Sequence, residues 1–189
     1  FFTFLFGGLD FLPFVCGVLK NNEMKSIRFY GDTLTRTRVI NNILRTFDAS
    51  QNVGTDGLKW YENAKDFAMK LVEEHNGKSN HYINFIQAAG IISAISPLMR
   101  WDRNKYLAKM FLRLMRTEGH ADGLKCMGLA KNKATAIYYC MAPTEPQLCS
   151  LIDTIINGNK TTAFYRNIAF PHSSDLVTID RHALSVALG

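Results

Sequence analysis

The most constraining stretch of this sequence is the run from Tyr82 to Ser96, which is apolar on nearly every side of a helix. A helix that is hydrophobic all round is stable in water only when it is buried in a core. Pro97 follows directly, and a proline ends a helix because it lacks an amide hydrogen and clashes with the preceding turn. We therefore expect residues 82–96 to form the central helix of a bundle.

Several other segments carry apolar residues at helical spacing and can supply the helices that cover this one. Segments rich in glycine and asparagine separate them, for example the expected loop at residues 48–57. The chain has 189 residues, of which 47% are hydrophobic and 20% charged, which suits one domain with a sizeable core. The sequence therefore predicts an all-α, multi-helix bundle. The expected outer helices span residues 34–47, 58–75, 102–117, 131–142 and 147–156.

Charge and cysteine content narrow the range of partners and cofactors. A net charge of +6 favours an anionic partner, although many basic proteins bind no nucleic acid. The four cysteines form no C-x-x-C pair and show no repeated metal-ligand spacing. We therefore expect reduced, mostly buried thiols and neither a metal nor a cofactor. The cysteines are Cys16, Cys126, Cys140 and Cys149.

Residues 1–19 are almost entirely apolar and unlike the remainder of the chain. They are barely long enough to span a membrane, and Asp10, Pro13 and three glycines oppose that interpretation. We expect residues 1–23 to be an extension that is either not native or disordered, and residues 24–189 to form the helical domain. A membrane anchor is the alternative, and the leading expectation is a cytoplasmic monomer.

Two motifs towards the C-terminus offer chemistry. The stretch Asn157-Gly158-Asn159-Lys160-Thr161 begins with residues that tolerate left-handed backbone angles and then resumes helical spacing. It predicts a tight turn that opens a helix, whose amide hydrogens suit a phosphate group. Twenty positions after the lysine, Asp180 precedes another apolar run. A lysine and an aspartate that met in space would supply a nucleophile and an anion.

These motifs resemble those of the helix-hairpin-helix DNA glycosylase superfamily of the endonuclease III type. Residues 158–161 match its Gly-x-Lys-Thr hairpin, and residues 179–182 are similar to its Val-Asp-x-His element. Residues 91–96 are similar to its Leu-Leu-Ser-Ala-Gln helix, and residues 128–137 to its Gly-Leu-x-x-x-Lys-Ala-x-x-Ile helix start. The four elements occur in family order over residues 79–189, and the sequence looks most like an uncharacterised phage and bacterial branch.

The resemblance implies an orthogonal helical bundle with a helix-hairpin-helix motif. Such a protein binds double-stranded DNA, flips a base out of the duplex and cleaves its N-glycosidic bond. The chain departs from the family pattern at Ile156, where a second glycine is usual, and the domain is expected to be incomplete at its C-terminus. Many relatives carry a four-cysteine iron–sulfur cluster after the aspartate, and none is expected here.

The family also implies roles for the matched residues. Asp180 corresponds to the aspartate that stabilises charge on the sugar and activates the attacking group, with an N-cap of a final helix as the alternative role. Lys160 matches the lysine that forms a Schiff base in bifunctional members, with a phosphate contact as the alternative. An attacking amine must be neutral part of the time, which needs burial or nearby cations. Candidate cations are Lys131, Lys133 and Arg166, and the implied DNA-binding residues of the hairpin are Asn157, Gly158, Asn159 and Thr161.

The turn after the central helix combines apolar and cationic side chains. Leu98 or Met99 would fill the gap left by an extruded base, while Arg100 would contact phosphate. The alternative is that Trp101 packs against the next helix and Asp102 caps that helix.

Two functions compete on these grounds. The first is a base-excision enzyme, a DNA N-glycosylase with or without lyase activity. The second is a non-catalytic helix-hairpin-helix DNA-binding protein. The presence of both Lys160 and Asp180 favours the enzyme. The basic face of the helix at residues 102–117 either lies along DNA or is a solvated surface.

Overall fold

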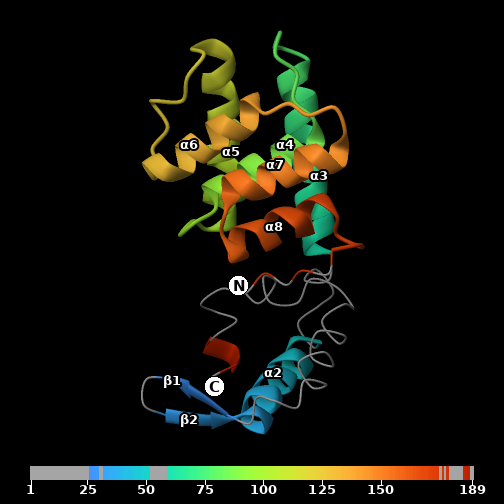
Figure 1. Cartoon of the computed structure of the whole chain (residues 1–189), viewed down its shortest axis with the longest axis vertical. Helices are drawn as coiled ribbons and strands as arrows, with labels where there is room; N and C mark the ends of the chain where they lie inside the picture. Colours follow the sequence, from blue (N-terminus) through green and yellow to red (C-terminus); the bar gives the residue numbers. More distant parts are fainter. Residues whose placement is uncertain are drawn as a thin grey trace. The chain divides into compact units, whose positions relative to one another are not determined.

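The computed structural model describes residues 26–29, 32–51, 59–174, 176, 178 and 185–187, and Figure 1 traces the whole chain. The chain divides into two compact units, one formed by Phe1–Tyr61 with Val177–Gly189 and the other by Glu62–Leu176. The apolar segment at residues 1–23 lies outside the described residues. No helix among the described residues is long and apolar enough to cross a bilayer.

The larger unit is a bundle of α-helices, which confirms the predicted all-α class (Figure 1). Each helix expected for this part of the chain is present, with its ends shifted by up to three residues. The helices are α3 (Trp60–Asn76), α4 (Phe85–Ile95), α5 (Trp101–Thr117), α6 (Gly128–Tyr139), α7 (Glu145–Ile156) and α8 (Asn159–Ala169).

Helix α4 is the centre of this bundle, as its apolar sequence predicts. Residues 86–95 are all buried, and α4 contacts α5, α6, α7 and α8. Its start is fixed by a capping box, in which Asn84 Oδ1 accepts from the amide of Gln87 and Gln87 Oε1 accepts from the amide of Asn84, both at 2.9 Å. The helix therefore begins three residues later than the apolar run.

A glycine allows two outer helices to approach α4 closely. A Cβ atom at Gly90 would lie 3.0 Å from Ile152 Cγ2 of α7 and 3.2 Å from Ile137 Cγ2 of α6. Both isoleucines are fully buried, so neither side chain has free space into which it can move. The close packing of α6 and α7 on α4 thus depends on the absence of a side chain at Gly90.

The buried polar groups of the bundle are largely satisfied within it. The side-chain amide of Gln87 donates to the carbonyls of Ile137, Tyr138 and Cys140, at 3.0 to 3.1 Å, at the end of α6. His75 Nε2 lies 3.0 Å from the carbonyl of His81 and 3.3 Å from the hydroxyl of Tyr138. Burial lowers the pKa of His75 below its ordinary value.

The smaller unit contains a short β-hairpin that the sequence analysis did not predict. Strands β1 (Ser26–Phe29) and β2 (Asp32–Thr35) pair antiparallel, with Ser26 opposite Thr35. Helix α2 (Arg36–Gln51) follows directly and corresponds to the helix expected at residues 34–47. Within this unit Asn42 Nδ2 donates to the carbonyl of Ala187 at 3.1 Å.

Three of the four cysteines lie among the described residues. Cys126, Cys140 and Cys149 are free thiols, of which Cys149 is buried and the other two are partly exposed, while Cys16 lies outside the described residues. Burial raises the pKa values of Cys126 and Cys140. Among the described residues, no group of three His, Cys, Asp or Glu side chains is placed to hold a metal ion.

Candidate nucleic-acid interface

Helices α7 and α8 are separated only by Asn157 and Gly158, so the predicted tight turn between two helices is present. Asn157 adopts a left-handed conformation (φ 41°, ψ 55°), and its amide bonds the carbonyl of Asp153 at 2.9 Å. Asparagine is one of the few residues that tolerate such angles, as the sequence indicated.

Gly158 allows the Thr161 side chain to approach the backbone closely. An unusual backbone angle is not the reason for a glycine here. Its backbone is extended (φ −162°), which any residue can adopt, but a Cβ atom there would lie 2.9 Å from Thr161 Oγ1. The Thr161 hydroxyl turns back to donate to the carbonyl of Gly158 at 3.0 Å. Ile156, which replaces the second glycine of the glycosylase pattern, is a buried core residue at the end of α7.

Two side chains from other helices and one ion pair between α7 and α8 hold this turn in place. The hydroxyl of Ser93 in α4 donates to the carbonyl of Thr161 at 2.5 Å. The ammonium group of Lys133 in α6 donates to the carbonyl of Ile156. Arg166 of α8 forms a two-pronged ion pair with Asp153 of α7, in which Nε lies 3.1 Å from Oδ1 and Nη2 bonds Oδ2. This hydrogen bonding to Asp153 raises the pKa of Arg166.

The outward side of the turn is available to a partner. Asn157, Gly158, Asn159 and Lys160 are all exposed. The first α-helical hydrogen bond of α8 runs from the amide of Thr162 to the carbonyl of Gly158, at 2.8 Å. The positive end of the α8 dipole therefore faces solvent beside a lysine, which is an environment that attracts an anion.

The turn between α4 and α5 presents a leucine in an unusual state. Leu98 has a left-handed backbone (φ 62°) and its side chain is 79% exposed. Left-handed angles are unfavourable for L-residues other than glycine by roughly 1–2 kcal/mol. The amide of Met99 bonds the carbonyl of Ser96 at 3.0 Å, which closes the turn. An apolar side chain is thus held outward on a constrained turn.

The structure also places Arg100, Trp101 and Asp102, for which the sequence left open a DNA-contacting role and a packing or capping role. Trp101 packs edge-on against Phe67 of α3 (ring centroids 5.8 Å apart) and Phe164 of α8 (6.5 Å), so it has a packing role, against α3 and α8 where the next helix was expected. Arg100 is exposed and occupies the N-cap position of α5. The prediction that Asp102 caps α5 is wrong, because Asp102 lies within the first turn and pairs with Lys105 at 2.8 Å.

The two turns lie at the same side of the bundle (Figure 1). The bond from Ser93 to Thr161 joins the last part of α4 to the first turn of α8, and the Trp101–Phe164 contact joins α5 to α8 one turn further on. Leu98 and Arg100 follow Ser93 within seven residues in the sequence. An apolar projection, an arginine and a helix N-terminus with a lysine are therefore combined in one region.

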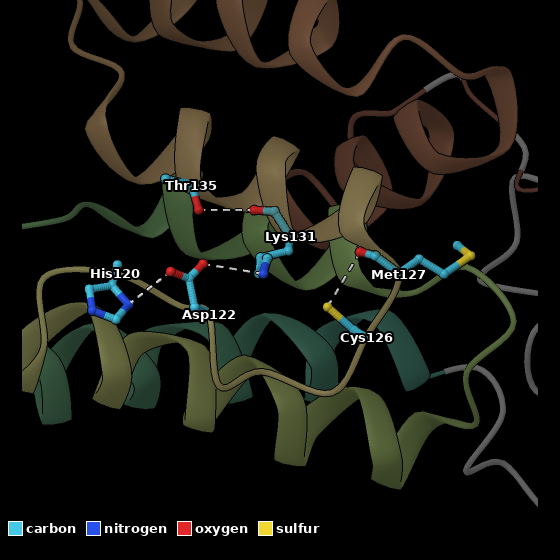
Figure 2. A network of polar contacts seen from close by, with 6 residues as sticks. All are labelled: His120, Asp122, Cys126, Met127, Lys131 and Thr135. Atoms are coloured by element: carbon cyan, nitrogen blue, oxygen red, sulfur yellow. Dashed lines mark hydrogen bonds and ion pairs between the residues drawn. The ribbon is translucent and has the colours of Figure 1, made fainter.

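The cations suggested as neighbours of Lys160 have other partners. Figure 2 shows Lys131 at the start of α6, with its ammonium group 3.4 Å from Asp122 Oδ1, while Asp122 Oδ2 lies 3.4 Å from His120 Nδ1. In the same view Cys126 donates to the carbonyl of Met127, and Thr135 to that of Lys131. Lys133 and Arg166 bond Ile156 and Asp153 as described above. Together with the exposure of Lys160, these contacts give no support to the expectation that the three cations activate it.

The predicted catalytic aspartate, Asp180, lies outside the described residues. The structure therefore places Lys160 in the same turn as Asn157, Gly158, Asn159 and Thr161, on the side of the bundle that carries the α4–α5 turn (Figure 1), and leaves the proposed pairing of the lysine with Asp180 as a prediction. Sequence reasoning missed the Asp153–Arg166 ion pair, although opposite charges on both sides of a predicted turn were the available signal. It also gave no sign that Leu98 would be left-handed.

Comparison with known proteins supplies a family but no activity. Residues 25–189 match a protein family described as a family of unknown function, DUF7178. No curated protein and no solved structure matches the chain.

Proposed function

The chain belongs to the family of unknown function DUF7178, and from its own interface we propose that it is a DNA glycosylase-like protein that flips a base from duplex DNA and cleaves its N-glycosidic bond. The observation that carries the proposal is the exposed, left-handed Leu98 near the two-residue turn between α7 and α8, which corresponds to the expected hairpin. A buried leucine would have a packing role, whereas an outward one on a constrained turn suits insertion between bases.

The hairpin supplies contacts to the DNA backbone. The N-terminus of α8, with Gly158, Asn159 and Lys160 exposed, binds a phosphate through amide hydrogens and positive charge. Arg100, which is exposed two residues after Leu98, binds a second phosphate. These contacts carry no base specificity, so they position the duplex while Leu98 fills the place of the extruded base.

Cleavage breaks the bond between the sugar C1′ atom and the base nitrogen, and the bond electrons leave with the base. Asp180 stabilises the positive charge that develops on the sugar. The new bond to C1′ is made either by water, which loses a proton to Asp180, or by the neutral amine of Lys160. The lysine route gives a Schiff base that leads to strand cleavage, and the water route gives an abasic site.

The experiment is a screen of duplexes that each contain one modified or mismatched base, with base release measured for the wild-type protein and for Asp180→Asn. We expect release from at least one duplex, loss of release in the variant, and unchanged DNA retention. Borohydride trapping then separates the two routes, since only attack by an amine gives a covalent adduct. Base release without an adduct excludes Lys160 as the nucleophile.

A second candidate function is supported by the surroundings of Lys160. An attacking lysine needs burial or unpaired cations nearby, yet Lys160 is exposed and the three suggested cations bond other groups. These facts favour a DNA-binding protein that uses the hairpin without catalysis. Tight duplex binding with no base release from any member of the screen would select this candidate and reject the enzyme.

A further inference from the structure

Helix α5 presents a basic face that the interface described above does not use. Arg103, Lys109 and Arg113 are exposed and, at 3.6 residues per turn, lie within an arc of about 120° around the helix; this set is called the α5 basic face. The whole helix carries five cations and one carboxylate, a net +4, while the entire chain has +6. Most of the net charge of the protein is therefore concentrated on one element.

Little of this charge is neutralised within the protein. The only carboxylate of α5, Asp102, pairs with Lys105, outside the α5 basic face. Lys109 lies 3.9 Å from Glu74, at the limit of an ion pair. Over the part of the chain that the structure describes, neither Arg103 nor Arg113 pairs with a carboxylate. The guanidinium of Arg103 lies over the ring of Tyr106 at 5.0 Å, which favours one orientation of this cation.

The α5 basic face continues from the proposed interface. Helix α5 begins directly after Arg100, so Arg103 lies within one turn of the residue assigned to a phosphate contact. At a rise of 1.5 Å per residue, Arg103 and Arg113 are about 15 Å apart along the helix. Successive phosphates of one DNA strand advance by about 3.4 Å along the duplex, so this span equals about four base pairs.

The composition of the helix argues against an anionic membrane as the partner. Helices that lie on membranes insert an exposed apolar face, whereas the apolar side of α5 is used inside the bundle, where Leu107, Phe111 and Met115 are buried. The exposed side of α5 carries arginine and lysine with one large apolar residue, Tyr106, which is 53% exposed, and this suits a line of phosphates better than insertion into a bilayer.

We infer that the α5 basic face is a phosphate-binding track that extends the duplex DNA interface by about four base pairs beyond the Leu98 turn. The inference rests on the proposed function, because the same duplex must occupy the hairpin. It adds a sequence-independent contribution to affinity that does not depend on a flipped base. Binding of unmodified duplex should therefore already use this track.

The test is the salt dependence of binding to an unmodified duplex, measured by fluorescence anisotropy. Each phosphate contact contributes about 0.9 to the slope of log K against log salt concentration. Arg103→Gln/Arg113→Gln should therefore reduce the slope by about 1.8, with the affinity difference shrinking as salt is raised. The control, Lys78→Gln/Lys125→Gln, removes the same charge from exposed positions outside α5 and should leave the slope within the error of the wild type.

The outcomes separate the inference from the proposed function. If the wild-type protein binds duplex and both double variants have the wild-type slope, the track is disproved and the hairpin interface stands. If the wild-type protein does not bind duplex DNA, both the inferred track and the proposed function are disproved. A slope change that is found with single-stranded RNA or with anionic phospholipid vesicles, but not with duplex, assigns the α5 basic face to another partner and overturns the inference. Circular dichroism of each variant checks that a reduced slope of log K against log salt concentration does not arise from unfolding.

Discussion

The hydroxyl of Ser93 donates a hydrogen bond to the carbonyl of Thr161, 68 residues later in the chain. Ser93 is fully buried in α4, whereas Thr161 lies in the first turn of α8 at the edge of the proposed interface. The bond therefore connects the most protected helix of the bundle to the segment that faces a partner. Because an interface on a rigid support loses less entropy on binding, this connection favours a preformed site.

Leu98→Gly should reduce base unstacking without lowering the stability of the fold. Glycine removes the left-handed strain of roughly 1–2 kcal/mol but adds about 0.5–1 kcal/mol of chain entropy, and little apolar burial is lost at an exposed position. The free energy of unfolding in urea should be unchanged or higher by up to about 1.5 kcal/mol. Fluorescence of 2-aminopurine in a duplex should show reduced unstacking.

Leu98→Ala serves as the control, because it also removes the apolar projection but keeps the strained angle. It should be less stable than the glycine variant and equally poor at unstacking. If both variants unstack the base as well as the wild-type protein, Leu98 has no role as a wedge.

Asp153→Asn should weaken the link between α7 and α8. The side chains of Asp153 and Arg166 are only 30% and 28% exposed, so the variant leaves a partly buried guanidinium without its counter-charge. We expect the free energy of unfolding to fall by about 1–3 kcal/mol. The matched control is Asp122→Asn, since Asp122 is 78% exposed and its pairs are 3.4 Å long, and it should change stability by less than about 0.5 kcal/mol. Equal losses in the two variants would contradict the assigned role of the Asp153–Arg166 pair.

Gly90→Ala should destabilise the bundle although alanine is the better helix former. The added methyl group would press on Ile152 and Ile137, both buried, and overpacking of this kind costs about 1–3 kcal/mol. The gain in helix propensity is about 1 kcal/mol, so we expect a net loss of up to about 2 kcal/mol in chemical denaturation. Gly128→Ala is the control, because a Cβ atom there meets nothing within 4 Å. A stabilised Gly90→Ala variant would show that α6 and α7 can move apart.

The sequence predicts the bundle well because its signals are local. The apolar run before Pro97 identifies α4, and Asn157 with Gly158 identifies the turn before α8. The β-hairpin at residues 26–35 was missed, because two strands of four residues carry too little periodicity to outweigh the helix that follows. The left-handed angle of Leu98 was also missed, since leucine has no intrinsic preference for that conformation and nothing in its residue type indicates it.

His75 should make the stability of the protein fall in mild acid. Its side chain is 1% exposed and burial lowers its pKa, so the folded protein resists a proton that the unfolded chain binds below about pH 6.5. The stability from neutral His75 is thus present above that pH and is lost as the pH falls. The nearby titratable groups are Arg116, which disfavours the proton further, His81 and Tyr138.

Urea unfolding between pH 7 and pH 5 measures this dependence. His75→Gln should be less stable than the wild type at pH 7 but should lose less stability on acidification. His120→Gln, a change at an exposed histidine, should retain the wild-type dependence. An unchanged dependence in His75→Gln would assign the acid sensitivity to other groups.

The bond from Lys133 to the carbonyl of Ile156 has an electrostatic consequence for anything that approaches the turn. Helix α7 ends where α8 begins, so the negative pole of one helix and the positive pole of the other lie two residues apart and would largely cancel at a distance. The ammonium group of Lys133 lies on the carbonyl of Ile156, the last residue of α7. It therefore offsets the negative pole of α7 and leaves the positive pole of α8 unchanged. The field that an incoming anion meets is therefore dominated by the attractive pole of α8.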